Sequence, residues 1–159
     1  QINAISFSPD NLLLAAAGQD EIVYIWNTSD WSEKYIVEDS DTPILDIDFS
    51  PDGKFLAIAE AGGLHVWDME KGIRVPNFNP QYKEFAVAYS PDGSLLVAAG
   101  NDRHVRIWRT DTFELVADLT GHKARVVSLD FSPDGQFLAS GAEYGEADYP
   151  PSVILWGLP

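Results

Sequence analysis

Apolar and polar positions alternate in four short segments of the chain, and each segment ends at a Ser-Pro-Asp turn. Alternation with a period of two is typical of a β-strand that has one buried face. In the first segment Ile5 and Phe7 share the apolar face, while Ala4 and Ser6 form the other. The sequence therefore predicts a strand before each turn, over residues 3–7, 45–49, 85–89 and 127–131.

The turn that follows each of these strands reads Ser-Pro-Asp-Gly, except that the first turn has Asn11 in place of glycine. Proline presets the second turn position, the Asp side chain can bond to nearby backbone, and glycine permits a positive φ at the fourth position. Asparagine is among the few other residues that adopt a positive φ readily. We therefore expect Asn11 to preserve the turn.

Three more strands are predicted after the turn, although the last repeat stops after the third strand. The second strand is short and rich in small apolar residues. The third is a nearly continuous apolar run, as expected for a strand covered on both faces, and the weaker, more polar fourth strand suits an exposed sheet edge. Each third strand ends at a tryptophan that we interpret as structural, and these are Trp26, Trp67, Trp108 and Trp156.

The repeat has a nearly constant length, because successive tryptophans lie 41, 41 and 48 residues apart. A period near forty residues is the length of one four-stranded β-propeller blade. The sequence therefore predicts one all-β propeller segment over residues 1–159, with three full antiparallel blades and a three-stranded last blade. The repeats occupy about 1–40, 41–80, 81–121 and 122–159.

The repeats resemble those of the WD40 family, whose consensus contains a Gly-His pair, a strand ending in Phe-Ser-Pro-Asp-Gly, a Leu-Ala-Ser-Gly strand and an aliphatic run ending in Trp-Asp. The fourth repeat is the most similar, through Gly121-His122, Phe131 to Gly135 and Leu138 to Gly141. The second repeat retains the Trp67-Asp68 dipeptide. The resemblance covers essentially the whole chain and implies a β-propeller of WD40 type.

The resemblance also implies structural roles for residues of a buried tetrad in that family, formed by His, Ser or Thr, Asp and Trp. The chain keeps His122 and Ser140 in the fourth repeat, and the tight-turn residues Asp20 and Asp102 in the first and third. The tetrad is incomplete in every repeat. We therefore expect the individual blades to depend more on packing than on this polar network.

The predicted strands number fifteen, which leaves the last blade without an outer strand. In WD40 domains the last blade commonly borrows that strand from the N-terminus, yet the chain opens at Gln1 inside the first strand pattern. We therefore expect the C-terminal four blades of a larger propeller, whose missing blades are expected partners. Two alternatives stay open, namely a homo-oligomer that closes a larger ring and a closed four-bladed unit.

The composition excludes several classes of function. Ten basic residues against twenty-five acidic ones give a net charge of −15, which repels nucleic acid and anionic lipid. No apolar run approaches the ~18 residues of a membrane span. The absence of cysteine excludes disulfides and thiolate metal sites. Cytoplasmic and extracytoplasmic locations are both compatible with this composition.

Candidate binding residues come from the resemblance, which places the loop before the first strand and the loop between the second and third strands on one rim, the top rim. The fourth repeat has about six extra residues there, between Ala142 and Ser152, whose tyrosines and carboxylates suit a basic protein segment. An ordinary acidic loop is the alternative. The candidates are Glu143, Tyr144, Glu146, Asp148 and Tyr149 in this insertion, and Asp39, Asp41, Gln81, Tyr82, Lys123 and Arg125 in neighbouring loops.

Catalytic motifs are missing from the sequence, which contains neither a Gly-x-Ser-x-Gly elbow nor a His-Glu-x-x-His pair. His65 and His104 lack partner ligands at metal spacing, so neither a metal nor a cofactor is expected. The sequence predicts a non-catalytic scaffold that binds other proteins through the top rim. The alternatives are the propeller part of a larger enzyme and a structural subunit of an extracytoplasmic assembly.

Overall fold

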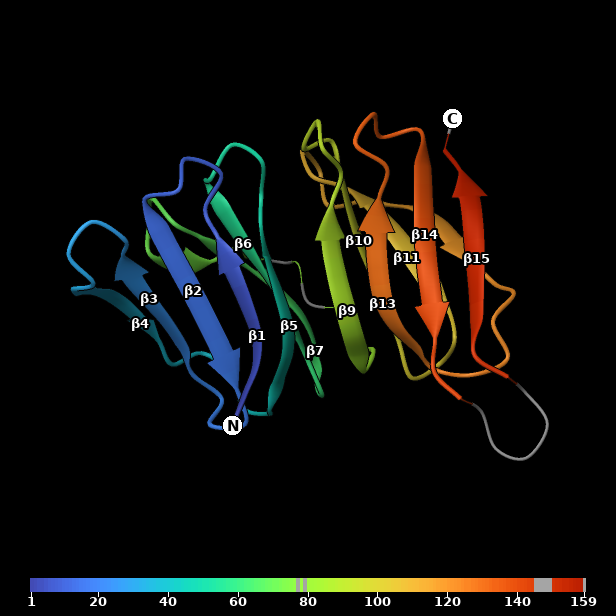
Figure 1. Cartoon of the computed structure of the whole chain (residues 1–159), viewed down its shortest axis with the longest axis horizontal. Coiled ribbons are helices and arrows are strands. Elements are labelled where there is room, and N and C mark those ends of the chain that lie inside the picture. Colours follow the sequence, from blue (N-terminus) through green and yellow to red (C-terminus); the bar gives the residue numbers. More distant parts are fainter. Residues whose placement is uncertain (77, 79, 145–149, 159) are drawn as a thin grey trace.

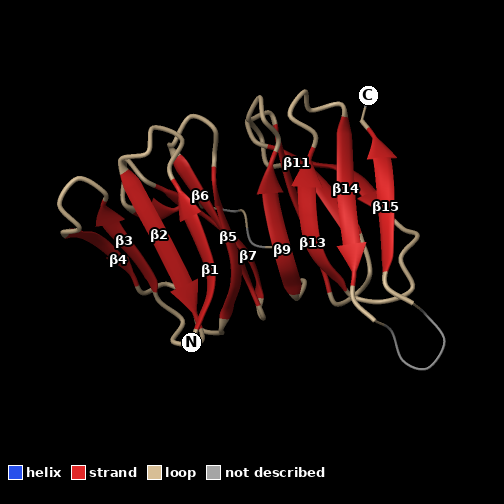
Figure 2. Cartoon of the chain, viewed as in Figure 1, coloured by secondary structure: helices blue, strands red, loops and turns tan. Residues whose placement is uncertain are grey.

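The computed structural model describes residues 1–76, 78, 80–144 and 150–158 of the chain (Figure 1). Within these residues the fold is all-β, with fifteen strands in four antiparallel sheets and no helix (Figure 2). The predicted fold class is therefore confirmed, including the three four-stranded blades and the three-stranded last blade.

The strands of each blade follow one another in both sequence and space. Blade 1 contains β1 (Ile2–Phe7), β2 (Leu13–Gly18), β3 (Val23–Asn27) and β4 (Glu33–Val37). Blade 2 contains β5 (Ile44–Phe49), β6 (Phe55–Glu60), β7 (Gly63–Asp68) and β8 (Ile73–Arg74). Blade 3 contains β9 (Glu84–Tyr89), β10 (Leu95–Gly100), β11 (Val105–Arg109) and β12 (Leu115–Leu119). Blade 4 contains β13 (Val126–Phe131), β14 (Phe137–Ala142) and β15 (Ser152–Gly157).

The four blades stand side by side, and their first strands lie next to one another in the order β1, β5, β9, β13 (Figure 1). These strands form the inner face of the row. Blades 1 and 4 are its two ends, so the row is open. The closed four-bladed unit is therefore not the arrangement that this chain adopts.

The four Ser-Pro-Asp turns share one hydrogen-bond pattern. In blade 3 the Ser90 hydroxyl donates to Asp92 Oδ1 at 2.6 Å and accepts from the Leu95 N–H at 2.9 Å. The fourth turn residue has a positive φ, which is 59° at Asn11 and between 71° and 74° at the three glycines. Asn11 therefore preserves the turn, as the sequence predicts.

The hydrophobic core lies between neighbouring blades. Phe49 and Ile47 in β5 of blade 2 belong to one buried cluster with Val23 and Ile25 in β3 of blade 1. Equivalent clusters fill the boundaries between blades 2 and 3 and between blades 3 and 4. Each blade thus has two different faces, and each face is covered only by a neighbour that presents the opposite one.

The two end blades each leave one such face uncovered. Ile5 and Phe7 in β1 are 66% and 55% exposed, although their counterparts in blade 2 are almost fully buried. At the other end Val153 and Leu155 in β15 are 76% and 64% exposed, while the matching residues of β11 are buried. Contiguous exposed apolar side chains of this kind mark interaction surfaces.

A β-bulge near the start of the first strand recurs in every blade. The pairing register shifts by one residue there, so that one residue of the first strand stays outside the ladder. A bulge re-aims the side chain of the extra residue. The residues in this position are Asn3, Leu45, Phe85 and Val127.

Candidate functional site

The top rim of the row is drawn along the lower edge of Figure 1, on the side where the N-terminus lies. Its described loops precede the first strands and join the second strands to the third. They contain the predicted residues Asp39, Asp41, Gln81, Tyr82, Lys123, Arg125, Glu143 and Tyr144. The predicted residues Glu146, Asp148 and Tyr149 lie outside the described residues.

The structure brings part of this set together at blades 3 and 4. Arg125 and Glu143 form an ion pair between the two top loops of blade 4, and the Glu143 N–H donates to the Arg125 carbonyl oxygen at 3.0 Å. The Arg125 guanidinium also lies 5.6 Å from the ring of Phe85 in blade 3. Asp39 and Asp41 belong to the rim of blade 2. The predicted set therefore does not form a single site.

A buried charge cluster supports the rim of blade 3. The Arg106 guanidinium is buried, forms an ion pair with Asp102, and lies 3.6 Å from the ring of Tyr82. Its Nη1 is 3.6 Å from Glu84 Oε1, and its Nε is 3.7 Å from Asp118 Oδ2. One cation is thus shared among three carboxylates and one aromatic ring.

Glu84 is the carboxylate of this cluster that is fully removed from solvent. Burial raises the pKa of Glu84 to about 8, although the positive charge of Arg106 opposes the shift. Neither carboxylate oxygen of Glu84 has a hydrogen-bond partner within the described part of the chain. Glu84 is therefore largely protonated near neutral pH, which lowers the cost of burying it.

Sequence analysis did not single out Glu84 or Arg106, although the sequence carries a signal for the latter. Arg106 lies between Val105 and Ile107 in a strand predicted to be covered on both faces. A charged residue at such a position has to be paired, because lysine, arginine and carboxylates are almost never fully buried alone. The partners could not be read from the sequence, since they come from β9 and β12 and from a loop.

The position of Arg106, two residues before the tryptophan, carries a polar contact in each of the first three blades. Tyr24 donates to Asp20 Oδ2 at 3.2 Å in blade 1, and His65 Nε2 lies 2.5 Å from Glu60 Oε1 in blade 2. Arg106 and Asp102 form the equivalent pair in blade 3. Blades 1 to 3 thus contain a polar pair below the rim that sequence analysis did not predict.

Blade 4 has a different polar network, centred on the buried hydroxyl of Ser140. Trp156 Nε1 donates to Ser140 Oγ at 2.7 Å, and His122 Nε2 lies 2.7 Å from the same oxygen. The second ring nitrogen of His122 lies 3.3 Å from Ser152 Oγ. Burial lowers the pKa of His122, so the ring is neutral at pH 7 and Nε2 can accept from the hydroxyl.

Two carboxylates on the inner face join blades 2 and 3. The Val87 N–H donates to Asp46 Oδ2 at 2.9 Å, and the Tyr89 N–H donates to Asp48 Oδ2 at 2.8 Å. These bonds satisfy backbone donors of β9 that have no strand beside them in the sheet. Burial raises the pKa of Asp48 to about 6, and it also raises the pKa of Asp46. The hollow beside them has a volume of about 380 Å³ and is lined by all four first strands.

The described residues contain no group of three or more His, Cys, Asp or Glu side chains placed to hold a metal ion. The two histidines considered for such a role instead pair with single carboxylates, His65 with Glu60 and His104 with Asp118. In the same part of the chain, no helix is long and apolar enough to cross a membrane.

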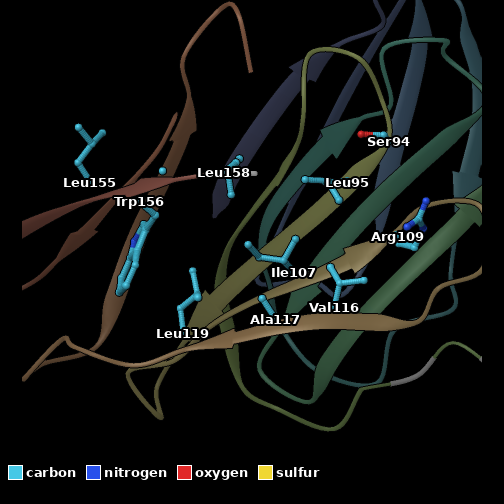
Figure 3. A pocket seen from close by; sticks show the side chains of 11 residues that line it. Ser94, Leu95, Ile107, Arg109, Val116, Ala117, Leu119, Leu155, Trp156 and Leu158 are labelled. Carbon is cyan, nitrogen blue, oxygen red and sulfur yellow. The ribbon is translucent and has the colours of Figure 1, made fainter. Parts of the chain in front are cut away.

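An apolar groove of about 550 Å³ separates the outer strands of blade 3 from β15 of blade 4. Figure 3 shows Trp156 on one side of this groove, with Leu119, Ala117 and Ile107 on the other. In the described residues β15 has β14 on one edge and no strand on its other edge. The groove therefore lies where the fourth strand runs in the other blades.

Comparison with known families gives matches along most of the chain. Residues 5–87 match the family described as the anaphase-promoting complex subunit 4 WD40 domain. Residues 85–109 and 113–146 match the WD domain, G-beta repeat. The first of these matches alone spans more than half of the 159 residues.

Individual relatives share the repeat at moderate identity. An uncharacterized WD repeat-containing protein of Synechocystis sp. is 31% identical over 143 residues, which are 89% of this chain and 41% of the relative. A periodic tryptophan protein 2 homolog of Dictyostelium discoideum is 27% identical, over 99% of this chain and 17% of the relative. The transcription initiation factor TFIID subunit 5 of Caenorhabditis elegans is 24% identical, over 98% of this chain and 23% of the relative.

The chain thus spans less than half the length of each of these relatives. The family matches agree with the four Ser-Pro-Asp turns, the four tryptophan-ending strands and the blade architecture. On this evidence the chain belongs to the WD40-repeat family.

Proposed function

We propose that the chain is a non-catalytic scaffold segment that binds partner proteins through the top rim of blades 3 and 4. One observation carries the proposal: cationic and aromatic side chains from two blades meet there, with the exposed Arg125 of blade 4 beside the half-buried Phe85 of blade 3. Tyr82, Lys123 and Tyr144 are exposed on the same rim. Tyrosine and arginine are enriched among the residues that dominate binding energy in protein interfaces.

Family membership supports the same role. WD40 propellers are generally non-catalytic platforms, and the C. elegans relative is a subunit of a transcription initiation factor. Fold alone does not assign a function, so the proposal depends on the side chains of the rim. The rim contacts described above involve the predicted residues Tyr82, Arg125 and Glu143.

Site-specific photo-crosslinking tests this proposal. A benzoylphenylalanine at Tyr82 or Tyr144 should form crosslinks to partner proteins in cells that express the full protein. The matched control is the same residue at Trp31, which is 62% exposed in the loop between β3 and β4 on the opposite rim. Crosslinks that form at Trp31 but not at the two tyrosines would contradict a top-rim interface.

We also infer that the uncovered faces of blades 1 and 4 each take a further propeller blade. At each blade boundary within the chain, the two packed faces are of different kinds. Blade 1 leaves one kind of face uncovered, and blade 4 leaves the other kind uncovered. The groove beside β15 provides an apolar site for an outer strand at the same end. The blades can come from a longer polypeptide or from a second copy of the chain.

Light scattering tests this inference on the 17.5 kDa chain. We expect association above the chain mass, and we expect the double variant V153K/L155K to return the chain to that mass, because two charges would have to be buried at the joint. A discrete species of twice the chain mass would indicate two copies closing one ring. A wild-type chain that stays monomeric would contradict the inference.

A further inference from the structure

Charge is divided unevenly along the top rim. The described rim loops of blades 1 and 2 contain five carboxylates and neither lysine nor arginine, the carboxylates being Asp20, Glu21, Glu38, Asp39 and Asp41. The described rim loops of blades 3 and 4 expose four of the ten basic residues of the chain, Lys83, Arg103, Lys123 and Arg125. The same described loops contain two carboxylates, Asp102 and Glu143, and each is paired with an arginine. The described rim loops of blades 3 and 4 therefore carry an excess of positive charge, and we call the surface formed by these four cations the basic rim.

Phe85 organises the centre of the basic rim. It is the bulged residue of β9, and it is half-buried at the boundary between blades 3 and 4. Lys83 Nζ lies 5.4 Å from the centroid of its ring, and Arg125 Cζ lies 5.6 Å from the same centroid. A cation is attracted to an aromatic face at such distances. The ring therefore contacts one cation from each of two neighbouring blades.

Several charges of the basic rim lack a counter-ion. Arg125 pairs with Glu143, and the buried Arg106 pairs with Asp102. Lys83, Arg103 and Lys123 have no ion pair with any carboxylate in the described residues. An incoming anionic group would supply the counter-ion that these cations lack.

We propose that the basic rim binds an acidic peptide segment of a partner protein, with an apolar side chain of that segment seated on Phe85. This proposal rests on the proposed scaffold function and specifies the chemistry of the partner. A short acidic segment fits better than a nucleic acid, because a long polyanion would extend over the five carboxylates of blades 1 and 2. Sequence analysis favoured a basic partner for the insertion, but the described rim residues of blades 3 and 4 favour an acidic one.

Fluorescence anisotropy with the wild-type chain tests the proposal. The labelled ligand is a short peptide of glutamates around one phenylalanine, and its counterpart has lysine in place of glutamate. We expect the glutamate peptide to bind, the lysine peptide to bind more weakly, and binding to fall as salt is raised. The variant K83E/R125E should weaken binding at least about tenfold, because it reverses both charges beside Phe85.

The matched control is K34E/K54E, which makes the same change in net charge with exposed lysines that lie away from the top rim. It should leave the affinity of the glutamate peptide within about twofold of wild type. Equal losses of affinity in both variants would mean that net charge alone governs binding. A preference for the lysine peptide would indicate a basic partner instead of an acidic one. Either result overturns the proposal, as would an oligonucleotide that binds in place of the peptide.

The same experiment separates this proposal from the scaffold function. Crosslinks at Tyr82 or Tyr144 without affinity for the glutamate peptide would support the top-rim interface and contradict only the proposal of an acidic partner. Circular dichroism and urea unfolding of K83E/R125E show whether the variant keeps the fold. Because both side chains are exposed, loss of the Arg125–Glu143 ion pair should lower the urea midpoint of unfolding only slightly.

Discussion

Replacing Arg106 with methionine should lower the free energy of unfolding by about 3 kcal/mol. The guanidinium is the shared cation of Glu84, Asp102 and Asp118, and it packs on Tyr82. Removing one partner of a buried ion pair typically costs about 3 to 5 kcal/mol. We expect the lower end of that range because Glu84 is already largely protonated near neutral pH, and because Asp102 and Asp118 are partly exposed to solvent.

Urea unfolding at neutral pH measures this loss. The control is Arg109→Met in the same strand, where the arginine is exposed and paired with the exposed Asp111. Exposed ion pairs contribute about 0 to 1 kcal/mol, so the control should change stability by no more than that. Equal effects at the two positions would show that the cluster around Arg106 does not stabilise the fold beyond an ordinary surface pair.

The pH dependence of the Glu84→Gln variant tests whether the raised pKa of Glu84 affects the stability of the fold. The pKa of Glu84 is raised by folding from 4.5 to about 8. A carboxyl with a raised pKa stabilises the fold fully below its ordinary pKa, and this contribution is lost as the pH rises through the folded value. The wild-type chain should therefore lose more stability than Glu84→Gln between about pH 5 and about pH 8, by at most about 1.4 kcal/mol per pH unit. Parallel curves would contradict this prediction.

Replacing Trp108 with alanine should cost about 3 to 5 kcal/mol, whereas the same change at Trp26 should cost less than half as much. Trp108 is buried at the boundary between blades 2 and 3, where its ring meets the edge of Phe78 at a centroid distance of 5.8 Å. Trp26 occupies the matching position of blade 1 but faces the uncovered end. It stacks on Tyr24 at 5.8 Å within its own blade.

Both substitutions are best compared in the V153K/L155K background, which we expect to prevent association at the end faces. Unfolding followed by far-ultraviolet circular dichroism avoids a signal that depends on tryptophan itself. Similar losses at the two sites would mean that each tryptophan acts mainly within its own blade. A much larger loss at Trp108 would place the stabilisation at the boundary with the preceding blade.

Local chemistry explains why so much of the fold could be predicted from the sequence. The alternation around Ile5 and Phe7 specifies a strand with one apolar face, and the Ser-Pro-Asp turn with Asn11 specifies how that strand ends. The strand ending at Trp108 has the apolar run of a doubly covered strand. Consecutive strands of the chain pair as antiparallel hairpins within each blade. These local signals therefore predict the positions of the strands without information from distant residues.

The site depends on contacts that such signals do not contain. Lys83 and Arg125 both contact Phe85 only because a bulge re-aims that ring and two blades pack together. Glu84 reaches Arg106 across the sheet, and its burial there raises the pKa of its carboxyl. The sequence by itself determined the strands, the turns and the family of this protein. Tertiary structure decided which faces are covered and which charges meet, because both depend on packing between residues far apart in the chain.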